Sequence, residues 1–533
     1  MFDILINNAD IVDGSGIKSY KGFIGVTGDK ITFIDKNPPS DTSAAKTIDA
    51  TGLRVAPGFI NMLSWAAETL YEDGRSMSDL YQGVTLEVMG EGFSFGPMSP
   101  EFKNELKKNF DFQIDEEWST FEEFMTLLEK HNISCNITSF VGSINPRALV
   151  IGFENRPASQ NELEKMNKIV DQAMQEGALG LGSSLIYPPD SYSASSELLA
   201  MAKVVSKYNG TYTFHMRSEG ESIEEAIDEV LTIAKEANIK VHIHHLKLAG
   251  KTNWKKFDRV INKIEQAQQH GIKITANMYN YAAAGTGLSS CIPPEYHAGG
   301  QESFLKNLNN PELRKNIKEE MRKTSKKWEN LYLEGPENIV PTGFVNKELE
   351  KYAGKSIKEI SVIQGKSPED TIIDLLLEDK SRIDTIYYMM NERLLDKQAV
   401  LPWVSFCSDE GSYSPKCRYY QSLVHPRSYG SFARVIGRYV NEKKLFSIEE
   451  GIRKLTSLPA SIIGLKNRGI LKKDHYADIV IFKQEEVKDY ATYDKPHALA
   501  TGMKHVIVNG VPVIQEGKHT GKFPGRFLKK SSL

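Results

Sequence analysis

The chain has 533 residues, of which 40% are hydrophobic, 25% charged and 9% aromatic. This composition is typical of a folded globular protein, and the length leaves room for several domains or for one large barrel with additions. Lys and Arg number 66 against 69 Asp and Glu, so the net charge of −3 excludes a field strong enough to hold nucleic acid non-specifically. We therefore expect no nucleic-acid partner.

The cysteines and the N-terminal residues point to a cellular compartment. Cys135, Cys291, Cys407 and Cys417 include no Cys-x-x-Cys pair, so they indicate neither a disulfide framework nor a thiolate zinc site. The sequence starts without a basic leader followed by an apolar core, and it has no run of about 18 apolar residues. We expect a cytoplasmic protein without membrane insertion. The sequence leaves a homo-oligomer open.

Both ends of the chain are rich in short β-strand patterns. In residues 1–58 short apolar strand patterns alternate with turns, and about the last 65 residues show the same pattern. The apolar run 505–508 closes on Asn509-Gly510, a strong signal for a two-residue hairpin. We expect residues 1–58 and 470–533 to form one small β-sandwich domain.

The central residues 59–469 alternate short β-rich runs with amphipathic helices, which is typical of a parallel sheet. The natural closure is an α/β fold of the (β/α)8 TIM-like barrel type. Residues 223–237, for example, place apolar side chains at three- and four-residue steps, as a helix packed on a core does. Residues 296–360 are richer in Lys, Glu and Asn and interrupt this rhythm. We interpret them as an inserted helical lid, although a solvated surface helix agrees equally well with their composition.

Two histidines at the ends of predicted strands are candidate metal ligands. In the run 211–217 strand alternation places His215 on a polar face, and in the run 239–247 it places His245 and Lys247 together near the end. Functional residues gather at the carboxyl ends of TIM-barrel strands. Two neutral imidazoles at one rim suit a divalent metal such as zinc. The alternative is a pair of hydrogen-bonded core histidines.

Carboxylates end two further predicted strands. Glu91 follows the run 83–89 and can supply an anionic third ligand; Glu87 has the same parity and is the reserve candidate. Asp409 ends the run 403–409, where a carboxylate can accept a proton from an attacking water and return it to a leaving amine. The alternatives are a glutamate in a surface turn and an aspartate that caps a helix or a turn.

Taken in order, these segments resemble the N-acyl-D-amino-acid deacylase (D-aminoacylase) family of the amidohydrolase superfamily over nearly the whole chain. The stretches that carry the resemblance are 55–60, 83–85, 177–182, 185–189, 215–220, 245–254, 279–281, 286–288, 408–409, 425–427, 477–480 and 519–521. The resemblance implies a (β/α)8 barrel, a β-sandwich built from both termini, and zinc. It also implies hydrolysis of a small N-acyl D-amino acid to a carboxylate and a free amino acid.

The resemblance also implies roles for individual residues. His215 and His245 fall on metal-ligand positions, Asp409 on the catalytic acid and base, and Lys247 on a group that meets the substrate carboxylate. Further residues fall near substrate-contacting segments, with Arg427 the weaker candidate: Tyr187, Tyr192, Tyr279, Tyr281 and Arg427.

The departures from the family pattern shape the predicted metal site. The superfamily usually has Asp-x-His-x-His after the first barrel strand, but here Leu63 and Trp65 stand in place of the two histidines. The family's cysteine ligand is also missing, and Glu91 occupies its place. We therefore expect one zinc ion, held by Glu91, His215 and His245, with the weaker second metal site lost. Two alternatives are a metal-free barrel that acts as a binding or assembly protein, and a cyclic-amide hydrolase of the same superfamily.

Overall fold

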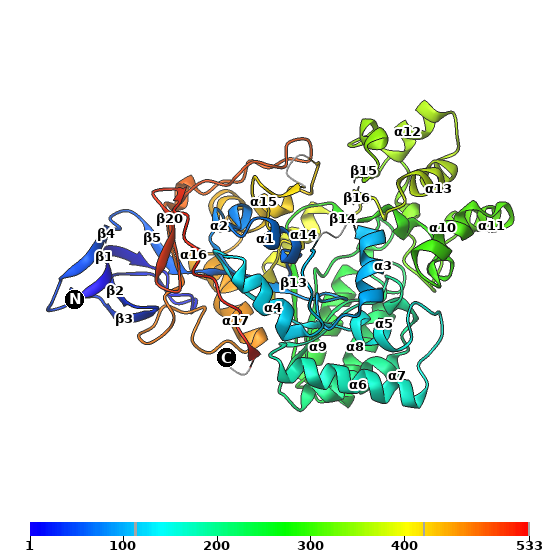
Figure 1. Ribbon diagram of the computed structural model, residues 1–533. Helices are drawn as coiled ribbons and strands as arrows, with labels where there is room; N and C mark the ends of the chain where they lie inside the picture. Colours follow the sequence, from blue (N-terminus) through cyan, green and yellow to red (C-terminus); the bar gives the residue numbers. More distant parts are fainter. Residues whose placement is uncertain (111–113, 419–421, 531–533) are drawn as a thin grey trace.

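The computed structural model describes residues 1–110, 114–418 and 422–530. It has a β domain on one side, an α/β barrel in the middle, and a smaller α/β insertion beside the barrel (Figure 1). Within the described ranges no helix combines the length and the apolar character that crossing a membrane requires.

Strands from both ends of the chain build the β domain. Its described strands pair in the order β21-β20-β19-β18-β5-β1-β2-β3, with β4 against β1. Their bounds are β1 Phe2–Ile11, β2 Tyr20–Thr27, β3 Lys30–Asp35, β4 Ala44–Asp49, β5 Arg54–Pro57, β18 Ile479–Phe482, β19 Met503–Val508, β20 Val511–Gln515 and β21 Lys518–His519. Asn509 and Gly510 join β19 to β20 with φ angles of 49° and 78°, as an Asn-Gly hairpin requires. Strand β5 lies between β1 and β18, so the two ends of the chain share one sheet.

The central part is a barrel of parallel strands. The bounds are β6 Phe59–Asn61, β7 Val84–Met89, β8 Asn136–Ser139, β9 Val141–Gly142, β10 Gly180–Ser184, β11 Thr211–His215, β12 Lys240–Ile243, β13 Ile274–Met278 and β17 Val404–Phe406. One run pairs as β6-β7-β8 and the other as β9-β10-β11-β12-β13-β17. Phe140 separates β8 from β9, and its N–H donates to Met89 O, so the two runs are continuous there. Beyond β17, Asp409 N–H donates to Leu63 O at 2.9 Å, which closes the barrel against β6.

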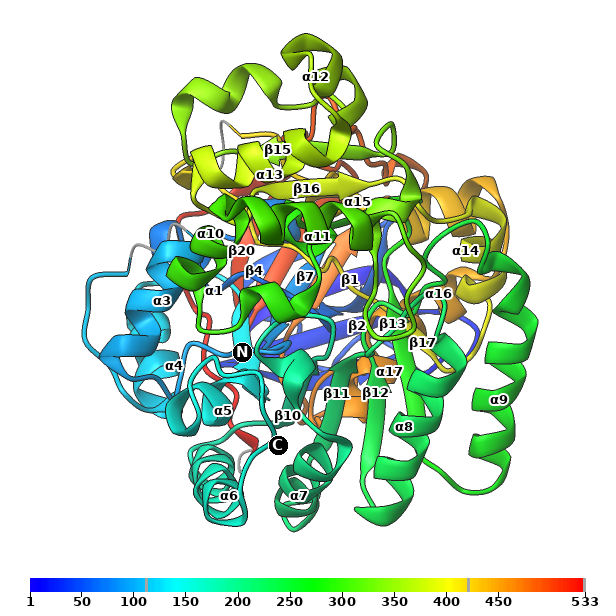
Figure 2. The same ribbon diagram turned by 90° about the vertical axis from the view of Figure 1, so that its right-hand side faces the viewer.

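Helices cover the outside of the barrel (Figure 2). Those around β10 to β13 are α6 Gln160–Gln175, α7 Ser195–Ser206, α8 Ile223–Glu236 and α9 Phe257–Gln269. Helix α8 buries Ile223, Ile227 and Val230, the predicted stripe. The other helices of this part are α1 Ala67–Glu72, α2 Met77–Leu80, α3 Pro100–Phe110, α4 Phe121–Lys130, α5 Ile144–Val150, α14 Glu392–Ala399, α15 Arg427–Arg434, α16 Ile448–Leu455 and α17 Ser457–Ile463. Barrel, helices and terminal sheet together confirm the predicted fold class.

The chain between β13 and β17 forms the insertion. Its helices are α10 Gln301–Asn309, α11 Pro311–Met321, α12 Ile357–Gln364 and α13 Pro368–Asp379, and its strands are β14 Ala284–Gly287, β15 Ile339–Gly343 and β16 Asp384–Tyr387. The strands pair antiparallel in the order β14-β16-β15, which the helical interpretation of 296–360 did not include. The backbone N–H of Gln301 on α10 donates to Glu105 on α3, so the insertion rests on the barrel's own α3.

The last described residues return to the barrel. Gly525 N–H donates to Ile133 O and Leu528 N–H donates to Ile137 O, both at 2.9 Å. Thr138 Oγ1 donates to Leu528 O at 2.8 Å. The segment 525–528 therefore lies along β8 and contributes backbone partners to a barrel strand.

Candidate functional site

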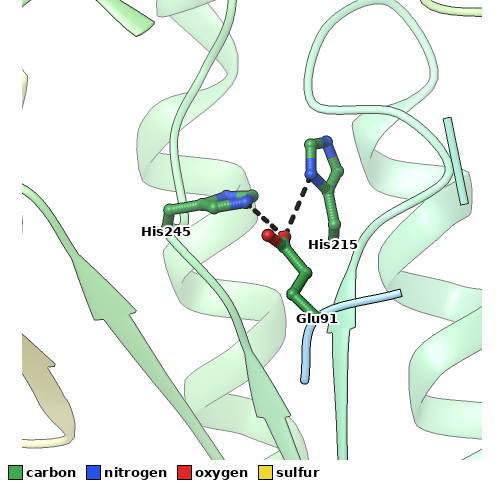
Figure 3. Close-up of side chains that lie close together, drawn as sticks. All are labelled: Glu91, His215 and His245. Atoms are coloured by element: carbon green, nitrogen blue, oxygen red, sulfur yellow. Dashed lines mark hydrogen bonds and ion pairs between the residues drawn. The ribbon is translucent and has the colours of Figure 1, made fainter. Parts of the chain in front are cut away.

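Three buried side chains meet at the carboxyl ends of the barrel strands β7, β11 and β12. Oε1 of Glu91 lies 3.2 Å from Nδ1 of His215 and 2.8 Å from Nε2 of His245. Figure 3 shows both imidazoles directed at the Glu91 carboxylate. The possible ligand atoms of the three residues all lie within 4.8 Å of one another. The structure thus brings together the three predicted metal ligands.

The backbone after each strand end is shaped to present these groups. Glu91 stands between Gly90 and Gly92, whose φ angles are 100° and 69°. Glycine adopts such positive values without the steric cost that a side chain would bring. His245 follows β12 by two residues at a φ of 33°, an uncommon value for a residue with a side chain. The strand predicted to continue to Lys247 ends instead at Ile243, and a turn brings His245 to the rim. Asn277 on β13 fixes this turn by accepting the His245 N–H.

The donor set fits a divalent metal ion. One carboxylate oxygen and two imidazole nitrogens are ligands that zinc accepts, and ligand atoms around tetrahedral zinc lie roughly 3.3 Å apart. The separations of 3.2 Å and 2.8 Å at Glu91 are close to that value. Burial raises the pKa of Glu91, but His245 and His215 outweigh burial and hold this pKa well below its ordinary value. Glu91 is therefore anionic at neutral pH, as a metal ligand has to be.

Glu219, which the strand patterns did not single out, organises the far side of His245. Its Oε1 lies 3.0 Å from Nδ1 of His245 and accepts from Nζ of Lys247 at 2.6 Å. Burial raises the pKa of Glu219, but Lys247 and the two histidines lower it far below the usual range. Nζ of Lys247 also lies 2.6 Å from Nδ1 of His245, so Glu219 and Lys247 together hold the imidazole with Nε2 facing Glu91. The feature of the sequence that points to Glu219 is its position four residues after His215.

Asp409 follows β17, which pairs with β13, and it is held on both carboxylate oxygens. The indole N–H of Trp65 donates to Oδ1 at 3.2 Å, and Nη1 of Arg427 lies 2.8 Å from Oδ2. The strand β17 ends at Phe406, earlier than predicted. A turn follows it, as after β12, and Asp409 in this turn has a φ of 54°. Burial would lower the pKa of Arg427, but Asp409 and other neighbours raise it, so the guanidinium stays charged.

These groups line one cavity of about 490 Å³ between the barrel mouth, α3 and the insertion. Predicted residues in its lining are Glu91, Tyr187, His215, His245, Lys247, Tyr279, Asp409 and Arg427. The structure places two predicted tyrosines elsewhere: the Tyr192 hydroxyl donates to Pro294 O at 2.6 Å, and the Tyr281 ring packs under the guanidinium of Arg434. Neither is among the described residues of the lining.

Glu87, the reserve ligand, lies deeper in the barrel. Its Oε2 accepts from Asn61 Nδ2 at 2.9 Å, in a buried cluster that also contains Asp79 and Ser408. Burial, followed by the charge of Asp79, raises the pKa of Glu87 well above its ordinary value. A carboxyl that favours its protonated form is a poor metal ligand, and Glu87 does not join the cluster of Glu91 and the histidines.

The chain resembles known amidohydrolases. Residues 405–514 match the model of the "Amidohydrolase family". A D-aminoacylase of Alcaligenes xylosoxydans xylosoxydans is 28% identical, over 100% of this chain and 98% of that relative. A solved D-aminoacylase with a binuclear metal centre, described as activated by one metal and attenuated by a second, has a TM-score of 0.80 and 27% identity. That alignment covers 99% of this chain and 100% of the other.

A second solved structure has the same fold. It is an N-acyl-D-glutamate deacylase from Bordetella bronchiseptica in complex with zinc and a phosphonate inhibitor. Its TM-score is 0.81 at 24% identity, with 99% of each chain covered. The predicted resemblance to D-aminoacylases therefore extends over the whole chain in both sequence and fold.

Proposed function

We propose that this amidohydrolase, which resembles the D-aminoacylases over its whole length, hydrolyses the amide bond of N-acyl-D-amino acids with one zinc ion. The observation that carries the proposal is the convergence of Glu91, His215 and His245 beside Asp409, in one cavity. When bound there, a zinc ion acidifies water and withdraws electrons from a carbonyl oxygen. The products are a carboxylate and a free D-amino acid.

The chain's own groups supply the proton transfers and the orientation. Asp409 accepts a proton from the attacking water and later donates it to the leaving nitrogen, so one carboxylate serves as base and then as acid. Trp65 and Arg427 hold its two oxygens at 3.2 Å and 2.8 Å, which fixes the direction of transfer. Glu219 keeps His245 in the orientation that faces Glu91.

A cationic side of the cavity meets the substrate carboxylate. Arg427 lies over the Tyr279 ring at 4.5 Å, and Nζ of Lys247 lies 5.6 Å from the same ring. The Tyr279 hydroxyl has no hydrogen-bond partner among the described residues, although it is buried. Lys247 is paired with Glu219 and Arg427 with Asp409, but both keep further N–H donors, which together with the Tyr279 hydroxyl can bind a carboxylate. A free-carboxylate substrate is therefore favoured over a cyclic amide.

Leu63 and Trp65 support a single ion. Leu63 is 1% exposed and packs in an apolar cluster, and the Trp65 indole is engaged with Asp409. Neither side chain offers the lone pair that a second ion requires.

The test is a panel of N-acyl D- and L-amino acids incubated with the zinc-supplied protein, with free amine as the readout. We expect hydrolysis of D-substrates and about one zinc per chain by elemental analysis. Asp409→Asn should retain the fold and the zinc and lose turnover. The control is Asp489→Asn, which removes a carboxylate paired with Arg434 at 3.1 Å, away from the cluster. Full activity in Asp409→Asn would overturn the mechanism, and a chain that takes up no zinc would favour the metal-free binding protein.

A further inference from the structure

The cavity has two chemically different sides that meet at Glu91. The cationic side consists of Lys247, Arg427 and Tyr279. The other side, which we call the apolar wall, consists of Phe93, Phe95, Phe102, Ile144, Phe153 and Phe304. The proposed function assigns an occupant to the cationic side but leaves the apolar wall without one.

The apolar wall begins beside Glu91, and Phe93, Phe95 and Phe153 pack against the hydrophobic cluster that contains Phe102 and Ile144. Phe93 follows Glu91 by two residues, and its ring centroid lies 5.5 Å from that of Phe95. The backbone N–H of Ile144 donates to Gly92 O at 2.9 Å, which places α5 against the same loop. The wall therefore adjoins the proposed metal ligands without an intervening charged side chain in this loop.

The wall extends from the barrel to the insertion. The Phe102 ring on α3 lies 6.1 Å from the ring of Phe153, and Phe153 O accepts from Gly299 N–H at 3.0 Å, just before α10. Phe304 lies on α10 itself. Glu105 also lines this part, but its carboxylate is engaged with the Gln301 N–H and lies 3.6 Å from Nζ of Lys108. At this end of the wall, the Glu105 carboxylate is therefore engaged by the protein's own groups.

The positions of the two sides orient the substrate. The scissile amide has to lie at Glu91, His215 and His245, and the carboxylate of the amino acid is attracted to Lys247 and Arg427. The acyl group then points away from the cations, along the apolar wall. An acetyl group has a single methyl, which would leave most of the wall in contact with water. A cavity of about 490 Å³ is in the range that holds ligands considerably larger than an N-acetyl amino acid.

We propose that the apolar wall is an acyl-chain site and that the enzyme prefers medium-chain or arylalkyl N-acyl groups over N-acetyl. The inference rests on the proposed function and names the class of acyl group that the same site takes. Each methylene buried against the wall should strengthen binding by about fourfold, so that four additional methylenes give about 200-fold. The gain should level off where the chain reaches α10.

The experiment compares N-acetyl, N-butanoyl, N-hexanoyl and N-octanoyl derivatives of the D-amino acid that the zinc enzyme hydrolyses best. We expect kcat/KM to rise with chain length by the factor given above. Calorimetric titration of zinc-loaded Asp409→Asn with the same ligands should show the same order in Kd, independently of turnover. Equal or falling values along the series in both measurements would overturn the acyl-chain site and leave the proposed function standing. Absence of hydrolysis for every member would instead count against the proposed function.

Variants locate the effect. Phe153→Ala should lower the hexanoyl-to-acetyl ratio of kcat/KM at least tenfold, because it removes a ring from the middle of the wall. Ile144→Phe, which fills the same space and keeps the wall apolar, should shorten the preferred chain. Ile363→Ala, on the exposed α12, is the matched control and should leave the ratio at its parent value. Unchanged ratios in both wall variants would place the acyl group elsewhere.

Discussion

The indole N–H of Trp65 donates a hydrogen bond to Oδ1 of Asp409 over 3.2 Å. Trp65 stands where the amidohydrolase pattern has a histidine, and its ring also packs 5.3 Å from that of Phe93. Trp65 thus offers a hydrogen-bond donor and an apolar surface at a position where the family pattern has a metal ligand. In this chain the aspartate is oriented by an indole and a guanidinium.

Trp65→Phe should lower kcat by about tenfold and change KM less. A hydrogen bond to a charged group contributes about 1.5 kcal/mol or more, and phenylalanine retains the aromatic surface. Steady-state kinetics on the best N-acyl-D-amino acid checks this. Trp403→Phe is the control, because its indole donates to Glu265, away from the cavity lining. A Trp65→Phe enzyme with parent kcat would show that the bond to Asp409 has no role in turnover.

Glu219→Gln should weaken zinc binding by about 10- to 100-fold, because the amide replaces the carboxylate that faces Nδ1 of His245. Competition with a chromophoric chelator measures the affinity directly. Glu225→Gln removes an exposed carboxylate paired with Lys326 and should leave the affinity unchanged. Parent affinity in Glu219→Gln would mean that Lys247 and Asn277 suffice to orient the imidazole.

Zinc affinity should also depend on pH through His245. Burial and Lys247 lower its pKa, but Glu91, Glu219 and Asp409 outweigh them and raise it to about 9 in the metal-free protein. The folded pKa lies above the usual 6.5, so the stabilisation from the charged imidazole is complete below about pH 6.5 and is lost as pH rises through about 9. Only the neutral ring binds a metal, so affinity should increase about tenfold per pH unit between pH 7 and 9. Chelator competition at three pH values tests this, and a flat profile would contradict it.

Asp79 should make stability fall as pH rises. Burial raises its pKa to about 7, against hydrogen bonds from Ser412, Ser78 and Asn61. Because the folded pKa exceeds the unfolded value of about 3.9, the stabilisation is present at low pH and disappears as pH approaches 7. Asp79→Asn should remove this dependence, a change of up to about 1.4 kcal/mol per pH unit between pH 5 and 7. Urea unfolding at pH 5, 6, 7 and 8 measures it.

Asp258→Asn, at an exposed site, is the matched control for Asp79 and should keep the parent slope. If the free energy of unfolding of Asp79→Asn depends on pH in the same way as that of the parent, another group of the cluster binds the buried proton.

Strand alternation was enough to place His215, because β11 runs up to that residue and its parity holds to the end. It was not enough for His245 and Asp409. There the strands stop at Ile243 and Phe406, and backbone turns with positive φ set the direction of the side chain. A histidine or an aspartate can adopt a positive φ, but the local sequence does not show where it does so, because tertiary contacts such as the His245 N–H to Asn277 decide it.

Contacts between distant segments were also beyond the sequence. Trp65 was recognisable as a missing histidine, but the partner of its N–H lies 344 positions away. Arg427 was a weaker candidate in the resemblance, yet it pairs with Asp409 at 2.8 Å. The apolar wall draws on α3, α5 and α10, three segments whose separate patterns indicate only ordinary packing. Strand ends and ligand chemistry are local properties, whereas the shape of the cavity is not.

The segment 525–528 that lies along β8 links synthesis of the chain to completion of the barrel. Ile133, Ile137 and Thr138 acquire these partners only after the ribosome has added Leu528, some 390 residues later. In a nascent chain this part of the barrel wall therefore lacks its seal until residue 528 has been added. A product shortened to residue 520 would keep every group of the cavity and still lack this seal, so proteolytic trimming at that end should affect the lifetime of the fold before it affects the chemistry.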